Sequence, residues 1–220
     1  MKRIVTDLKI QSIPRSGTTL LRNLLIPIFQ DETGSRIEMS HGVIVTNGPL
    51  LVNVRDFRDI TASLWRINHA KYDKEGKVKN KMSKLDVKGN VNSAIQNISS
   101  LNQTLHSNPQ ALLVRYEEYW DNPDRLLDQI EGYLDIKIPK ELREAGKANC
   151  DIKKMKALGD ELEDWDKVDE ETDIHGKHIY TGKPGTWKEF VEKDLRKRLN
   201  LKLRRYLKEY GYKSIYSRKK

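Results

Sequence analysis

A short loop near the N-terminus combines the residue types that can bind a phosphate-like anion. The phosphate-loop pattern G-x-x-x-x-G-K-[ST] matches residues 12–19, SIPRSGTT, at its second glycine and last threonine, but its first glycine and its lysine are replaced. Gly17 can turn several N–H groups toward one anion, and Arg15 supplies a positive charge. Hydroxyl donors come from Ser16, Thr18 and Thr19. The loop predicts an anion site; a simple turn with a capped helix is the alternative.

A second candidate anion site follows an apolar run at residues 50–54. Arg55 comes directly after this run, and Ser63 lies eight residues later, about two helical turns along. A guanidinium and a hydroxyl at this spacing can converge on one phosphate if the turn folds back. Spacing alone also allows Arg55 to be a surface ion-pair partner of Asp56 or Asp59.

Both candidate sites lie where an apolar strand meets a helix. Residues 8–13 alternate in polarity and end at a proline, and residues 50–54 and 111–114 resemble strands that are buried on both faces. Residues 43–45 are a further short strand candidate. Repeated strand–helix units predict one α/β domain over residues 1–220, with a parallel sheet flanked by helices and ligands beyond the carboxyl ends of the strands.

Three further segments complete the predicted organisation. Seven lysines and few large apolar groups predict an exposed, mobile excursion over residues 71–90. Apolar residues at three- and four-residue spacing predict one long helix over about 90–106. Leucines and tyrosines at helical spacing predict a basic amphipathic C-terminal helix at about 193–210.

Four motifs, in this order along the chain, resemble those of sulfotransferases that use 3′-phosphoadenosine 5′-phosphosulfate (PAPS). The family's 5′-phosphosulfate loop is similar to residues 13–21, IPRSGTTLL, and its 3′-phosphate motif is similar to residues 54–64, VRDFRDITASL. The Arg-Tyr-Glu-Asp segment and its Asn-Pro helix start resemble residues 113–123. The C-terminal Arg-Lys-Gly-x-x-Gly-x-Trp-Lys signature resembles residues 182–188, GKPGTWK. The resemblance spans about residues 8–190 and implies a P-loop-like sulfotransferase fold.

The resemblance implies transfer of a sulfuryl group from PAPS to a hydroxyl or amine acceptor, without a metal and with 3′-phosphoadenosine 5′-phosphate (PAP) as product. Matching positions imply that the cofactor is bound by Arg15, Ser16, Gly17, Thr18, Thr19, Arg55, Ser63, Tyr116, Gly182 and Lys183. For Tyr116, the alternative to cofactor binding is that it is a core tyrosine beside the strand. The signature's opening Arg-Lys pair is Tyr180 and Thr181 here, so a cationic contact to the 3′-phosphate is missing; Lys183 and Lys188 are near enough to compensate.

His41 and Arg15 are the candidate catalytic residues. Transfer needs a base on the acceptor and positive charge on the departing phosphate, which Arg15 supplies. His41 resembles the histidine that many family members use as the base, and an imidazole with an ordinary pKa near 6.5 suits proton removal at neutral pH. An ordinary loop histidine is the alternative, in which case His175 or His178 is the reserve candidate.

Charge and composition bear on the other function classes. The net charge is +9, but residues 193–220 hold twelve Lys/Arg and two acids, so the basicity belongs to the C-terminus. Residues 160–173 hold nine acids. This distribution is weak support for a nucleic-acid partner. A non-catalytic nucleic-acid-binding protein that uses the basic tail, and a P-loop kinase that lacks the pattern's lysine, are the two alternative functions.

The remaining features indicate the compartment and the partners. No segment approaches the roughly 20 apolar residues that span a bilayer, and no secretory signal is recognisable at the N-terminus. The one cysteine, Cys150, cannot form an intramolecular disulfide and fits a small buried residue. We expect a cytoplasmic enzyme with a small-molecule or carbohydrate acceptor. The sequence leaves open which acceptor this is and what oligomeric state the enzyme has.

Overall fold

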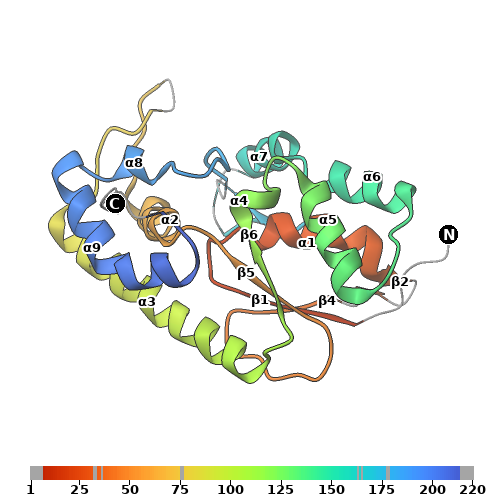
Figure 1. Cartoon of the computed structure of the whole chain (residues 1–220). Coiled ribbons are helices and arrows are strands. Elements are labelled where there is room, and N and C mark those ends of the chain that lie inside the picture. Colours follow the sequence, from red (N-terminus) through yellow and green to blue (C-terminus); the bar gives the residue numbers. More distant parts are fainter. Residues whose placement is uncertain are drawn as a thin grey trace.

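A computed structural model describes residues 7–31, 34, 35, 37–74, 77–162, 164, 166–176 and 179–213. A parallel sheet lies at its centre (Figure 1), with the strand order β4 (Ile37–Ser40), β1 (Leu8–Ser12), β5 (Leu50–Val54) and β6 (Leu112–Arg115). In the register of the central strand, Ile10 pairs with Met39 on one side and Leu51 on the other. The predicted single α/β domain with a parallel sheet is confirmed.

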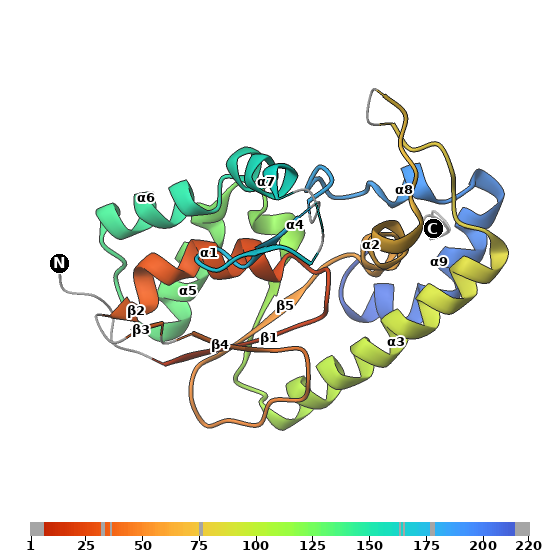
Figure 2. The ribbon, with the colours of Figure 1, turned by 180° about the vertical axis from the view of Figure 1, so that it is seen from behind.

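Helices cover both faces of this sheet (Figures 1 and 2). Side chains alternate between faces along a strand, so Leu51 of β5 joins one core cluster while Leu50 and Val52 join the other. The first cluster includes residues of α1 (Thr18–Phe29), α5 (Pro123–Leu134) and α6 (Lys140–Asn149). The second includes residues of α2 (Phe57–His69), α3 (Lys84–Ser107) and α9 (Lys193–Glu209).

Shorter elements connect these layers. The short helices are α4 (Tyr116–Tyr119), α7 (Ile152–Glu161) and α8 (Trp187–Phe190). Two antiparallel pairs of two-residue strands are formed by β2 (Gln30–Asp31) with β3 (Gly34–Ser35), and by β7 (Val168–Asp169) with β8 (Ile174–His175). Within the described ranges, each helix is too short or too polar to cross a bilayer.

The strand expected at residues 43–45 is wrong, because the edge strand of the sheet is β4 instead. Side chains of α3 satisfy the backbone of this segment: the Ile44 N–H donates to Thr104 Oγ1 at 3.0 Å, and Asn108 Nδ2 donates to the Ile44 carbonyl at 2.7 Å. Val43 and Val45 on either side are exposed. The segment is therefore fastened to a helix and not to a strand.

The exposed excursion expected over residues 71–90 is wrong in its second half. Helix α3 begins at Lys84, six residues before the expected start, where Ser83 and Asp86 form a capping box. Met82 and Val87 are buried in the core. The long helix itself is confirmed, and the lysines lie on its exposed side and in the preceding connection.

Helix α9 packs its apolar stripe against α2 and α3. Its buried residues include Leu195, Leu199, Leu203 and Leu207, while most of its basic residues are exposed. It lies at the end of the molecule opposite α6 (Figure 1).

Candidate active site

The loop between β1 and α1 has the conformation of an anion cradle. Gly17 has a φ of +91° and Arg15 a φ of +74°, so the chain turns twice through the left-handed region within three residues. Helix α1 begins at Thr18, and the N–H groups of its first turn have no acceptor inside the helix. A Cβ added to Gly17 would lie 2.3 Å from the Tyr116 ring, so only glycine fits this loop.

A buried polar network holds this loop on the sheet. Asn53 of β5 donates from Nδ2 to the carbonyl and to the hydroxyl of Ser16, both at 3.1 Å. The Tyr119 hydroxyl donates to Asn53 Oδ1 at 2.9 Å. Within this loop, Ser16 is fully buried. Its hydroxyl therefore fixes the loop in place, and it lines neither of the two cavities described next.

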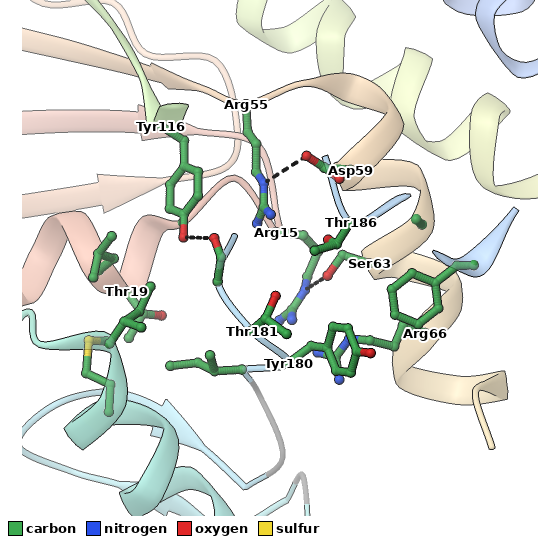
Figure 3. A pocket seen from close by; sticks show the side chains of 18 residues that line it. Arg15, Thr19, Arg55, Asp59, Ser63, Arg66, Tyr116, Tyr180, Thr181 and Thr186 are labelled. Atoms are coloured by element: carbon green, nitrogen blue, oxygen red, sulfur yellow. Dashed lines mark hydrogen bonds and ion pairs between the residues drawn. The ribbon is translucent and has the colours of Figure 1, made fainter. Parts of the chain in front are cut away.

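One cavity, which we name the arginine cavity, opens beside the loop at the carboxyl end of the sheet (Figure 3). Its polar wall is formed by the guanidinium groups of Arg15, Arg55 and Arg66. Tyr116, Ile152 and Met155 form an apolar wall. A cavity with these two walls can hold an anionic ligand that carries an apolar ring.

Arg15 extends into the arginine cavity and reaches α2. Its Nε donates to Ser63 Oγ at 3.1 Å, so the two expected anion sites meet in one cavity. Burial, and then the positive charges of Arg66 and Arg55, lower the pKa of Arg15 to about 9. The guanidinium is still charged at neutral pH.

Arg55 is stacked and only partly neutralised. Its guanidinium carbon lies 4.4 Å from the centre of the Tyr116 ring, and its Nε lies 3.9 Å from Asp59 Oδ2. One terminal nitrogen donates to the Lys183 carbonyl at 3.3 Å. The Nε is buried and has no hydrogen-bond partner among the described residues. A buried donor of this kind favours a ligand acceptor.

Asp59 fastens the C-terminal motif to α2. Its carboxylate accepts from the Gly185 N–H at 2.6 Å and from the Trp187 N–H at 2.8 Å. Burial raises the pKa of Asp59, while the Arg55 charge and the two N–H donors oppose this rise. Gly182 also lines the arginine cavity. The Tyr116 hydroxyl donates to the Gly182 carbonyl at 2.7 Å and holds Gly182 beside the Tyr116 ring.

A second cavity, which we name the histidine cavity, borders the same loop. Its lining includes Thr18, Met39, His41, Asp173 and His175. The Nδ1 of His41 lies 2.8 Å from the Ser12 carbonyl oxygen, which can only accept. In the neutral ring Nδ1 therefore carries the proton, and Nε2 carries the lone pair that can accept one.

The structure brings most of the expected site residues together. Around the arginine cavity lie Arg15, Gly17, Thr19, Arg55, Ser63, Tyr116 and Gly182. Around the histidine cavity lie Arg15, Gly17, Thr18, Thr19, His41 and His175. Lys183 lines neither cavity: its side chain is exposed, and its carbonyl accepts from Arg55. The reserve candidate His178 lies outside the described residues.

Sequence reasoning missed two charged residues of the arginine cavity. Arg66 lies three residues after Ser63 and so on the same side of α2, a spacing that could have drawn attention to it. From its spacing, Asp59 is indicated only as an ion-pair partner of Arg55. Its partners lie more than 120 residues later in the chain, and no local pattern points to them.

Comparison with known proteins agrees with this geometry. A family model described as a sulfotransferase domain matches residues 46–211. The chain is similar to the crystal structure of mouse sulfotransferase SULT7A1 complexed with PAP, at 15% identity and a TM-score of 0.63, with 94% of this chain and 88% of that one covered. A search of curated protein sequences found no match.

Retinol dehydratase provides two further structural matches. Its complex with retinol and PAP has 16% identity and a TM-score of 0.62, with 95% of this chain and 83% of that one covered. Its complex with androsterone and the inactive cofactor PAP has 14% identity and a TM-score of 0.61, with 92% and 81% covered. The chain belongs to the sulfotransferase domain family, and it is an enzyme of the sulfotransferase fold.

Proposed function

We propose that this protein transfers a sulfuryl group from PAPS to a hydroxyl or amine acceptor across the loop of residues 13–19. The observation that carries the proposal is that two unlike cavities both border that loop. One cavity has three guanidinium groups and an apolar wall, and the other has an imidazole whose Nε2 can accept a proton.

The donor set of the arginine cavity fits a nucleotide with two anionic ends. Its described lining contains three guanidinium groups and one carboxylate, Asp59, and the buried Nε of Arg55 is a donor without a partner in that part of the chain. Tyr116 and Ile152 offer the apolar contact that an adenine ring requires. PAPS, when bound, supplies an activated sulfuryl group on its 5′-phosphate. We infer that Arg55 and Ser63 bind the 3′-phosphate, and that Gly17, Thr18 and Thr19 bind the 5′ end.

His41 is the proposed general base. The Ser12 carbonyl accepts from Nδ1 and keeps Nε2 available to take the proton of the acceptor. The same carbonyl stabilises the imidazolium that results. Arg15 and the N–H groups at the start of α1 lie beside the loop and stabilise the negative charge that develops on the leaving phosphate.

The test is transfer of radiolabelled sulfate from PAPS to a panel of phenols, sterols, sugars and amines. Activity should persist in a metal chelator. PAP should also raise the melting temperature without magnesium, since a ligand at one hundred times its dissociation constant adds about 2.7 kcal/mol. Equal stabilisation by ATP with magnesium, and none by PAP, would contradict the proposal.

The acceptor and the location are further parts of the proposal. We infer a small-molecule or carbohydrate acceptor, because the histidine cavity is a local hollow beside the loop and the similar retinol dehydratase structures hold androsterone and retinol. We also infer a cytoplasmic location. Cys150 is a free, buried cysteine, and its burial raises its thiol pKa to about 12. Fractionation of the source cells with an antibody tests the location.

A further inference from the structure

A third arginine enters the arginine cavity from α2. Arg66 lies one helical turn after Ser63, and its side chain extends past Tyr180 toward Arg15 (Figure 3). Only 8% of Arg66 is exposed. It lines the cavity together with Arg15 and Ser63. This position places its charge where an anion bound in the cavity would lie.

The charges around Arg66 favour an anion there. The Arg66 charge acts on Arg15, and Arg55 acts on the same group, so three like charges share one cavity. Asp59 is the one carboxylate in the described lining, and it is already bound by two backbone N–H groups and by Arg55. A ligand phosphate with two negative charges relieves this repulsion.

Among the described residues of the C-terminal segment, 179–190, none that lines the cavity is a cation. The Tyr180 hydroxyl donates to Glu189 at 2.8 Å, and Thr181 accepts from the Lys183 N–H at 3.3 Å. Lys188 lies 5.9 Å from the centre of the Trp187 ring and, like Lys183, is exposed. Burial raises the pKa of Tyr180 to about 12, and the nearby Arg66 charge partly opposes this rise. In the part of the chain that the structure describes, Arg66 is thus a cation that acts on Tyr180.

The position of Arg66 also decides which end of the ligand it faces. The sulfuryl group must meet the acceptor at the histidine cavity, and Arg15 lines both cavities whereas Arg66 lines only the arginine cavity. Arg66 therefore belongs to the end remote from transfer. We propose that Arg66 is a 3′-phosphate ligand of PAPS and PAP, and that it supplies from α2 the cation that Tyr180 and Thr181 do not provide. This inference rests on the proposed function.

The experiment compares binding of PAP with binding of adenosine 5′-phosphate, which lacks the 3′-phosphate, by calorimetry. Arg66→Gln keeps a polar side chain, although a shorter one, and removes its charge. It should weaken PAP binding by roughly 10- to 100-fold and leave binding of adenosine 5′-phosphate within about threefold. Arg66→Lys should recover part of the loss, since it keeps a point charge without the planar fork.

Two controls separate the possible causes. Lys202→Met removes an exposed charge from α9 and should leave both affinities unchanged. Lys183→Met tests the rival cation: a lost preference for PAP in this variant, with a normal preference in Arg66→Gln, would overturn the inference. A wild-type protein without any preference for PAP would instead contradict the proposed function itself.

A second measurement needs no substitution. In a crystal structure of the wild-type protein with PAP, a guanidinium nitrogen of Arg66 should lie within about 3.2 Å of a 3′-phosphate oxygen. A guanidinium directed away from that phosphate would reject the inference even if Arg66→Gln failed to fold.

Discussion

The arginine cavity and the histidine cavity share one loop but are built in different ways. The arginine cavity is surrounded by side chains that hold one another, such as Arg15 on Ser63 and Arg55 on Tyr116. In the histidine cavity, His41 is hydrogen-bonded to Ser12 of β1, through the Ser12 hydroxyl and carbonyl. The difference indicates that the first cavity is prearranged for one fixed ligand, whereas the second fixes one reactive group and leaves the rest of its wall to vary.

The strongest test of this difference is removal of the base. His41→Ala should lower kcat by roughly 100- to 10,000-fold, because the acceptor loses its positioned proton acceptor. PAP affinity should remain within about threefold, since His41 does not line the arginine cavity. Steady-state kinetics and calorimetry give the two values. His106→Ala, an exposed position on α3, is the matched control. Normal turnover in His41→Ala with an inactive His175→Ala would move the base to β8.

A substitution in the shared loop should disturb both cavities, because Gly17 lines each of them. Gly17→Ala places a Cβ 2.3 Å from the Tyr116 ring at a φ of +91°, which should destabilise the fold by about 2 to 4 kcal/mol. The melting temperature should fall by roughly 5 to 15 °C. Gly89→Ala is the control, because nothing lies within 4 Å of its added Cβ and alanine favours the α3 helix. Equal melting temperatures for the two variants would refute this account.

Loss of Arg55 should affect only the arginine cavity. Arg55→Ala should weaken PAP binding by about 1.5 to 3 kcal/mol, the usual contribution of a charge-assisted hydrogen bond. Binding of adenosine 5′-phosphosulfate, which has no 3′-phosphate, should change much less. Competition assays with both nucleotides measure the ratio. A ratio equal to that of the wild type would remove Arg55 from the 3′-phosphate site.

The smallest expected effect concerns one hydroxyl in the cavity wall. Tyr116→Phe removes the hydrogen bond to the Gly182 carbonyl, so PAP binding should weaken by about 1 kcal/mol. Tyr133→Phe loses a comparable bond, from the Leu50 N–H, away from both cavities. It should lower the melting temperature without changing PAP affinity. If the two variants bind PAP equally well, the wall does not depend on the Tyr116 hydroxyl.

Local sequence patterns predicted the parts of the fold that local interactions determine. The runs at 8–13, 50–54 and 111–114 form strands within one residue of their expected limits, because the first alternates in polarity and the other two are compact and apolar. Strand β4 has two apolar residues and an exposed edge, so its pattern is weak. Residues 43–45 looked more apolar but are bound by α3 side chains, which no local pattern reveals.

The candidate site also combines residues that one local motif predicts with residues that long-range contacts place. Arg15, Gly17 and Thr18 are neighbours in the sequence, so their joint role follows from one motif. Other placements depend on contacts across the chain: Arg66 approaches Tyr180, and the reserve candidate His175 meets His41 at one cavity although 134 positions separate them. Long-range placement of this kind requires the folded structure.

Helix α9 makes the charge distribution of the molecule asymmetric. It holds eight basic and two acidic residues and lies at the end opposite α6 (Figure 1), while the acidic stretch that ends at Asp173 reaches the histidine cavity. Such a separation amounts to a molecular dipole, which aligns in an external field at low ionic strength. On a negatively charged matrix the protein should therefore adsorb in one orientation, with α9 in contact with the matrix and α6 directed away from it.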